Sequence, residues 1–158
     1  MVEFRVAKKE DCELILSFIQ QLAKYEKLEN EVEATVEALE DWLFTNMSAE
    51  VFFAVKDGKE VGFALYFTNF STFLGKAGLY LEDIFILPEY RGQGIGKLML
   101  KALAQMAVSC DFGRMEWSCL DWNTDSIEFY NALGAQAMSE WTTYRLSGGA
   151  LKELADSK

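Results

Sequence analysis

The sequence predicts an α/β protein of the α+β kind, in which a mixed, mostly antiparallel sheet is flanked by helices. Short apolar segments rich in Val, Phe and Tyr alternate with segments whose apolar residues recur at helical spacing. Turn residues separate these segments, and the single proline, Pro88, lies between apolar and charged stretches. Repeats, low-complexity tracts and linkers are absent from the 158 residues, so we expect one domain over residues 1–158.

The first half of the chain is expected to form a strand, two helices and three further strands. Asp11 is a candidate N-cap of the first helix, and Thr35 is a candidate N-cap of the second. Asp57-Gly58 is typical of a hairpin turn. The expected strands cover residues 4–6, 51–55, 61–67 and 79–87.

The second half begins with a clear amphipathic helix. Its apolar positions recur at helical spacing from Ile95 to Ala107. A strand is expected at 115–120, a short helix at 126–133 that ends before Gly134, and a final strand at 141–146. The resulting element order is β-α-α-β-β-β-α-β-α-β, which implies a mixed sheet.

The composition excludes several classes of function. The chain has no histidine, which rules out Ser-His and Cys-His nucleophile pairs, histidine zinc sites and histidine general bases. We predict no metal. Its formal net charge of -10 disfavours a nucleic-acid partner, because such binding relies on Lys and Arg at phosphates. A small cationic molecule is favoured instead.

The sequence also favours a cytoplasmic protein with no membrane partner. No apolar run approaches the roughly 18 residues of a membrane span, and the first residues lack the features of a signal peptide. The three cysteines, Cys12, Cys110 and Cys119, are widely spaced within apolar segments. This pattern suits reduced thiols in packing roles better than disulfides.

Three alternate glycines, Gly92, Gly94 and Gly96, stand immediately before the amphipathic helix. Such a loop leaves backbone N–H groups uncovered at the positive end of a helix dipole, which favours a bound phosphate, although a purely structural turn has the same composition. Two common nucleotide motifs do not fit. A Walker loop needs glycine at Arg91, and the dinucleotide fingerprint needs glycine at Lys97.

The segment Arg91-Gly92-Gln93-Gly94-Ile95-Gly96 fits the pattern Arg/Gln-x-x-Gly-x-Gly/Ala and resembles the GCN5-related N-acetyltransferase (GNAT) family. A second motif of that family is matched in order and spacing over residues 120–135. The chain is similar over nearly its full length to the diamine, spermidine/spermine and thialysine acetyltransferase group of the family. The segments that carry this closer similarity are 22–26, 80–83 and 89–96.

The resemblance implies an acyl-CoA N-acyltransferase fold with a V-shaped gap between two parallel strands, where acetyl-CoA pairs with a strand edge as a co-substrate. Arg91 and Lys97 supply positive charge beside the glycines. Asn123 and Ser126 are expected cofactor contacts, with capping of the short helix as the alternative. The predicted cofactor contacts are Ile84, Phe85, Ile86, Arg91, Gly92, Gln93, Gly94, Ile95, Gly96, Lys97, Asn123, Ser126 and Tyr130.

The predicted reaction is acetyl transfer to a primary amine. A lysine-like amine is protonated at pH 7, so a base must take a proton before the amine attacks. Glu82 is the candidate base, directly or through water, and a backbone N–H near Ile84 or Phe85 is placed to stabilise the carbonyl oxygen. Tyr130 matches the family tyrosine that protonates the leaving thiolate. Direct transfer in a ternary complex is favoured over an acetylated Cys119.

The resemblance also implies a substrate channel, formed by Tyr25, Glu26, Phe73, Glu82, Asp83 and Trp141. Polyamine enzymes of the group carry an acidic residue shortly before an aromatic residue in one loop, where this chain has Ser71 and Phe73. This difference favours a shorter diamine, thialysine or a lysine-like amine. Trp141 has a core or interface position as its alternative role.

Two other functions remain open from the sequence, a noncatalytic acyl-CoA-binding domain and a peptide or protein N-acetyltransferase. Retention of Glu82, Asp83 and Tyr130 favours the enzyme over the binding domain. A homodimer is expected from the family similarity and from the aromatic segment 141–144, which is suited to pairing across subunits.

Overall fold

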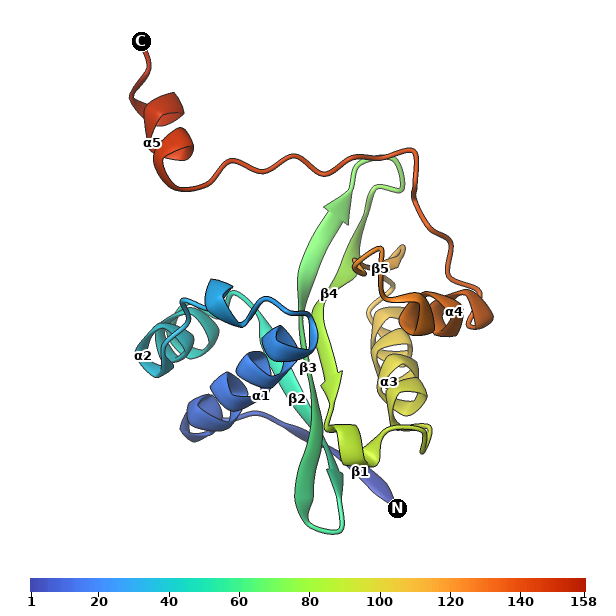
Figure 1. Cartoon of the computed structure of the whole chain (residues 1–158). Helices are drawn as coiled ribbons and strands as arrows, with labels where there is room; N and C mark the ends of the chain where they lie inside the picture. Colours follow the sequence, from blue (N-terminus) through green and yellow to red (C-terminus); the bar gives the residue numbers. More distant parts are fainter. The chain divides into compact units, whose positions relative to one another are not determined.

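A computed structural model describes all residues from 1 to 158, in two compact units that comprise residues 1–120 and 121–158. Figure 1 labels the main elements. The first unit contains β1 (Val2–Val6), η1 (Lys9–Asp11), α1 (Cys12–Tyr25), η2 (Glu29–Glu31), α2 (Val36–Leu39), η3 (Glu40–Thr45), β2 (Glu50–Lys56), β3 (Lys59–Ser71), β4 (Lys76–Ile86), η4 (Pro88–Tyr90), α3 (Ile95–Ser109) and β5 (Met115–Trp117). The second unit contains α4 (Thr124–Ala132) and α5 (Gly148–Asp156).

The sheet of the first unit confirms the predicted mixed, mostly antiparallel arrangement. Its strand order is β1-β2-β3-β4-β5. The pairs β1–β2, β2–β3 and β3–β4 are antiparallel, and β5 runs parallel to β4. The hairpin between β2 and β3 turns at Asp57 and Gly58, whose φ angles of 52° and 76° confirm the predicted tight turn.

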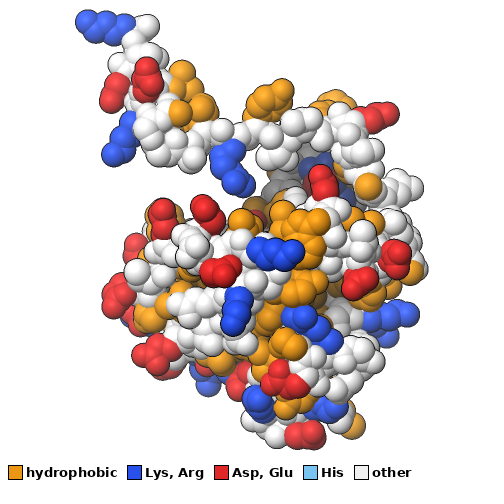
Figure 2. Space-filling model, in the orientation of Figure 1, with side chains coloured by type: hydrophobic (Ala, Val, Ile, Leu, Met, Phe, Trp, Pro, Cys, Tyr) orange, Lys and Arg blue, Asp and Glu red, His pale blue; other side chains and the backbone are white.

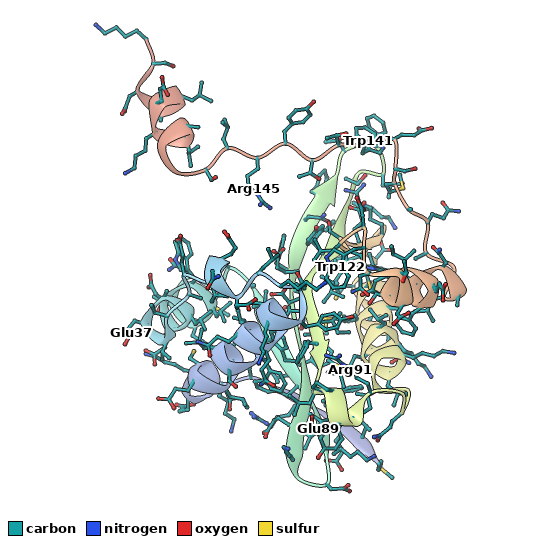
Figure 3. All side chains as sticks on the ribbon, viewed as in Figure 1. Glu37, Glu89, Arg91, Trp122, Trp141 and Arg145 are labelled. Carbon is teal, nitrogen blue, oxygen red and sulfur yellow. The ribbon has the colours of Figure 1, made fainter.

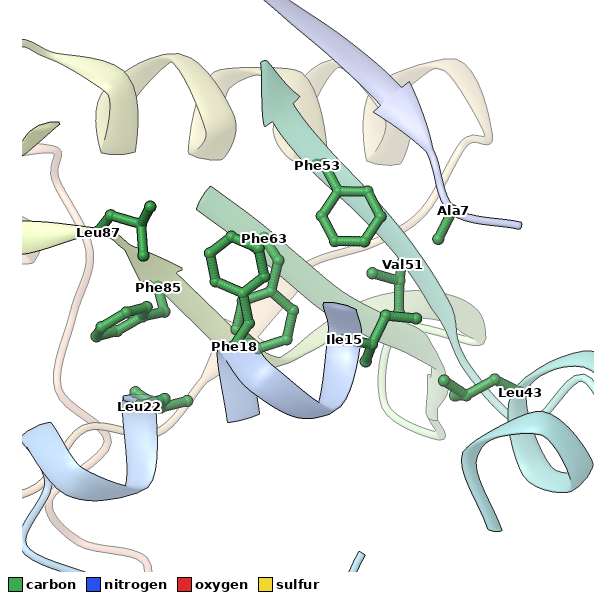
Figure 4. Close-up of a cluster of buried hydrophobic side chains, with 10 residues drawn as sticks. All are labelled: Ala7, Ile15, Phe18, Leu22, Leu43, Val51, Phe53, Phe63, Phe85 and Leu87. Atoms are coloured by element: carbon green, nitrogen blue, oxygen red, sulfur yellow. The ribbon is translucent and has the colours of Figure 1, made fainter. Parts of the chain in front are cut away.

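Helix α1 covers one face of the sheet and forms the main core with it. Phe18 projects from α1 between two strand residues, with ring centroids 5.9 Å from Phe53 and 5.2 Å from Phe63 (Figure 4). Aromatic side chains of this size dominate the apolar area that a core buries. Phe85 of β4 and Leu22 of α1 belong to the same cluster, so the core reaches the strand that carries the candidate site.

Helix α3 packs on the opposite face. Its residues Met99 and Leu103 are fully buried. A Cβ atom on Gly62 of β3 would lie 3.4 Å from the sulfur of Met99, which shows how closely helix and sheet approach. Beside α3 the sheet has an apolar hollow of about 130 Å³, which contains none of the predicted site residues. It is lined by Phe4, Val6, Phe52, Tyr66, Ala102 and Met106.

The two predicted helix caps had different outcomes. Thr35 caps α2 as predicted, because its hydroxyl oxygen accepts a hydrogen bond from the Ala38 N–H at 3.1 Å. Asp11 stands at the N-cap position of α1 but makes no capping bond. Its carboxylate accepts instead from the Arg5 guanidinium at 2.8 Å and from the Lys8 N–H at 2.7 Å. The charged partner on β1 offers the stronger hydrogen bond.

The second unit corrects one prediction. The expected strand at 141–146 is wrong, since these residues have no regular structure and no strand pairs with them. A strand requires partners for its backbone N–H and C=O groups, and the described chain supplies none here. Helix α5 was not predicted. Every residue from 136 to 158 is exposed, and Figure 2 shows apolar side chains on the surface of this segment.

None of the helices combines the length and the apolar character that crossing a bilayer requires.

Candidate active site

A β-bulge in β4 is the central feature of the candidate site. Leu81 pairs with Tyr66 and Asp83 pairs with Leu65, so Glu82 is an extra residue with no partner on β3. A bulge of this kind changes the face on which the following side chains lie. Before the bulge, Leu81 shares a face with Tyr66, which lines the hollow beside α3. After it, Phe85 lies in the core beneath α1.

The bulge brings Asp83 to the side of the sheet where α1 ends. Burial, together with the nearby carboxylates of Glu82 and Glu26, raises the pKa of the Asp83 carboxyl to about 7. Glu26 is the residue after α1, and burial raises the pKa of its carboxyl as well. We call Glu26, Glu82 and Asp83 the acidic group. A nearby cation stabilises carboxylates whose charge is disfavoured by burial and by one another. The acidic group is therefore suited to bind an ammonium ion.

The edge of β4 beyond the acidic group has no neighbouring strand on the β5 side. β5 pairs only with residues Leu79–Leu81 of β4, whereas β4 continues to Ile86. This arrangement is what the expected gap between two parallel strands requires. Ile84 and Ile86 are half-buried along this edge, where an extended ligand can pair with the backbone.

The glycine loop, which we define as Arg91–Lys97, follows β4 and leads into α3. Gly92 and Gly94 have φ angles of 72° and 78°, and a Cβ atom at either would meet nothing within 4 Å. The first backbone bond of α3 runs from Leu98 N–H to Gly94 C=O at 3.1 Å. The preceding N–H groups therefore have no acceptor within the helix and lie at the positive end of its dipole. The loop fits a phosphate group.

Two lysines of the β2–β3 hairpin lie beside the glycine loop. Lys56 donates from its ammonium group to the side-chain oxygen of Gln93. The Lys59 ammonium lies 3.8 Å from the Glu89 carboxylate and 5.4 Å from the centre of the Tyr90 ring. Neither lysine was among the predicted site residues. The hairpin was readable from Asp57-Gly58, but no local pattern shows that it ends next to a loop more than thirty residues later.

Arg91 is brought together with two other predicted site residues. Its guanidinium carbon lies 4.7 Å from the centre of the Tyr25 ring and 4.9 Å from that of Phe85. Figure 3 labels Arg91 and Glu89 at the turn that follows β4. The structure therefore joins the end of α1, β4 and the start of the glycine loop.

Phe73 is not brought into this group. It lies in the turn between β3 and β4 with 97% of its surface exposed. Ser71, the other residue that distinguishes this loop, accepts a hydrogen bond from the Leu74 N–H at 3.2 Å and helps to form the turn. Their predicted role at the substrate end stays a prediction.

The predicted site residues of the second unit form a local structure of their own. The Asn123 side chain accepts from the Ser126 N–H at 3.3 Å and caps α4, which is the alternative role foreseen for this pair. Tyr130 is half-buried on α4, with its ring centre 5.6 Å from that of Phe129. Trp141 is 74% exposed in the segment that lacks regular structure.

An unpaired strand edge, an open glycine loop at the start of a helix and a partly buried acidic group define an α/β transferase for a phosphate-bearing donor. A model of the acetyltransferase (GNAT) family matches residues 16–135, and the chain belongs to that family. This finding confirms the family resemblance and the predicted fold class.

Named relatives are similar over most or nearly all of the chain. A thialysine N-epsilon-acetyltransferase of Bos taurus is 39% identical, covering 98% of this chain and 97% of the relative. An L-ornithine N5-acetyltransferase of Arabidopsis thaliana is 48% identical over 59% of this chain and 41% of its own length. Among solved structures, an integron cassette protein of V. cholerae matches with a TM-score of 0.80 and 30% identity, covering 99% and 98% of the two chains.

Proposed function

We propose that this protein transfers the acetyl group of acetyl-CoA to a primary amine of a small cationic substrate, by direct attack in a ternary complex. One observation carries the proposal. The unpaired edge of β4 has the acidic group at its bulge and the glycine loop just beyond its other end. An anion-binding element and a cation-binding element therefore flank one short stretch of strand.

The glycine loop and the strand edge are the parts that hold acetyl-CoA, which supplies a thioester-bound acetyl group. The N–H groups of residues 95–97 and the Lys97 side chain bind phosphate. Lys56 adds a positive charge that the chain, at a net charge of -10, needs locally. The backbone from Ile84 to Ile86 pairs with the extended arm of the cofactor, and an N–H near Ile84 or Phe85 stabilises the carbonyl oxygen.

The acidic group binds the amine as its ammonium form. Glu82 accepts the amine proton, directly or through water, as predicted from the sequence. We propose Asp83 as a second proton acceptor; its pKa of about 7 supports this role, because such a group is matched to proton transfer near neutral pH. Tyr130 donates its phenolic proton to the departing sulfur, and Asn123 and Ser126 contact the cofactor.

The substrate class is narrowed by the relatives. Thialysine and L-ornithine, named for the relatives above, both carry a terminal primary amine on an amino acid. A human spermidine/spermine N(1)-acetyltransferase-like protein is 35% identical over 97% of this chain but is matched over only 24% of its own length. Together with Ser71 and Phe73, these similarities support a thialysine-like or lysine-like amine, with short diamines next and long polyamines last.

We also propose that residues 1–158 act as one acetyltransferase domain in the cytoplasm and as a homodimer. The family match covers parts of both units, which supports a single domain. The cysteines are free thiols, as a reducing compartment favours. The exposed aromatic segment 141–144 supports a dimer, because exposed apolar patches mark interaction surfaces.

The direct test is an amine panel. Thiol release from acetyl-CoA is measured with thialysine, ornithine, lysine, a short diamine, spermidine and a peptide with a free N-terminus. We expect the highest kcat/KM with thialysine or another amino acid of this kind. Tyr130→Phe and Glu82→Gln are expected to lower kcat by about 10²-fold or more. Glu13→Gln, on an exposed carboxylate at the start of α1, is the matched control.

Tight acetyl-CoA binding without turnover of any amine would identify a noncatalytic binding domain instead. Preference for the peptide over every small amine would identify a peptide N-acetyltransferase. Covalent acetylation of Cys119 that precedes product formation would replace direct transfer.

A further inference from the structure

Arg91 makes more contacts than a simple phosphate ligand requires. Its guanidinium carbon lies over both the Tyr25 ring and the Phe85 ring, at 4.7 Å and 4.9 Å from their centres. Its Nε donates to the backbone oxygen of Ile86 at 2.9 Å. The ring centres of Tyr25 and Phe85 are 6.4 Å apart. Arg91 is thus held by the last residue of α1 and by the end of β4.

These contacts connect the two sides of the proposed site. Tyr25 directly precedes Glu26 of the acidic group, whereas Arg91 is the first residue of the glycine loop. A guanidinium group stacks through its faces and donates hydrogen bonds in its plane. The Nε–H of Arg91 is used at the Ile86 carbonyl, so the N–H groups on its two terminal nitrogens remain suited to an anion. No Asp or Glu side chain forms an ion pair with Arg91.

We propose that Arg91 is a positioning residue that couples cofactor binding to the amine side, by holding Tyr25 and therefore Glu26 when a phosphate binds at the edge of its guanidinium group. The inference rests on the proposed function and deepens it. Coupling of this kind is reciprocal. A change at Tyr25, which belongs to the amine side, therefore alters the affinity for acetyl-CoA even when no amine is present.

The experiment is a calorimetric titration of acetyl-CoA without amine into five proteins: the wild type, Tyr25→Phe, Tyr25→Leu, Arg91→Gln and the double variant Tyr25→Leu/Arg91→Gln. We expect Tyr25→Leu to weaken binding about fivefold or more, because a cation–π contact is lost. Tyr25→Phe keeps the aromatic face and should bind like the wild type. The double variant should bind no more weakly than Arg91→Gln alone, since both changes remove the same contact.

Arg91→Lys provides a second test that keeps the charge. Lysine lacks the planar group that contacts both rings, so Tyr25→Leu should have no further effect in the Arg91→Lys protein. Thermal unfolding of each variant verifies that it is folded before titration.

The inference is overturned if Tyr25→Leu binds acetyl-CoA with the affinity of the wild type. It is also overturned if the loss of affinity in the double variant equals the product of the losses in Tyr25→Leu and Arg91→Gln. In both cases a wild type that binds acetyl-CoA leaves the proposed function intact. A wild type that does not bind acetyl-CoA refutes the proposed function and this inference together.

Discussion

At the scale of single residues, Asp83 is the most informative side chain of the site. Its position on the strand was predicted to contribute to substrate binding, but its environment could not be read from the sequence. The bulge at Glu82 and the end of α1 bring three carboxyls together, and burial raises the pKa of Asp83 from 3.8 to about 7. An amine bound here would favour the charged carboxylate and lower that pKa again.

The raised pKa of Asp83 predicts a specific dependence of stability on pH. The folded protein holds the Asp83 proton more tightly than the unfolded chain does, so this group favours folding less and less as pH rises from about 4 to about 7. Above the folded pKa the effect is constant. The side chain that Asp83→Asn introduces stays neutral at every pH. The unfolding free energy of this variant should therefore rise relative to that of the wild type as the pH increases from about 4 to about 7. Urea unfolding at several pH values measures it.

Glu26→Gln is the companion variant, because burial also raises the pKa of the Glu26 carboxyl. If the difference in unfolding free energy between the wild type and Asp83→Asn stayed constant from pH 4 to pH 8, the proposed burial of an ionisable Asp83 would be contradicted.

At the scale of elements, the glycine loop was predictable and the bulge was not. The loop is visible in the sequence as alternate glycines directly before a helix with a clear apolar period. In the structure Gly92 and Gly94 adopt positive φ, which glycine does at little cost. The bulge depends on the register between β3 and β4, which no single segment encodes. The same limit explains why Lys56 was missed, because only the folded hairpin brings it to Gln93.

Gly94 provides a prediction for the loop. It is the N-cap of α3, its backbone is in the left-handed region, and the space around its Cβ position is open. A side chain at this position is therefore disfavoured only by the backbone conformation and not by a clash with neighbouring atoms. Gly94→Ala should lower the unfolding free energy by about 1–2 kcal/mol. Gly94→Asn should cost less, because asparagine tolerates this conformation better. Chemical denaturation measures both values.

Gly149→Ala is the matched control for Gly94, since Gly149 lies in helix α5 with an ordinary φ and nothing within 4 Å of its Cβ position. It should leave stability unchanged or slightly higher. Equal losses at both positions would show that the loop conformation does not require glycine.

At the scale of the whole molecule, the sequence predicted the sheet, its mixed character and the order of all elements up to α4. The exception was the final strand at 141–146. Its Trp, Thr and Tyr residues are typical of a strand, but a strand forms only where a partner edge is available. The segment from 136 onward stays exposed, with Tyr144 92% accessible. The strand prediction was therefore wrong for this chain, because a segment's own residues do not show whether a partner edge is available.

A second copy of the chain is the partner that we propose for this segment. Light scattering at micromolar protein concentration should give the mass of a dimer. Replacing both Trp141 and Tyr144 by serine should shift the protein towards the monomer, because the aromatic surface available for burial is lost. A wild type that remains monomeric over the concentration range used for activity would remove the dimer proposal.

The proposed function requires that the glycine loop binds the phosphates of acetyl-CoA next to the open edge of β4. Hydrogen exchange of the backbone amides tests this most directly, with coenzyme A compared against pantetheine, which lacks the phosphates. We predict that coenzyme A slows exchange of the amides within residues 92–97, and that pantetheine leaves them unchanged. Unaltered exchange across residues 92–97 at saturating coenzyme A would contradict the account.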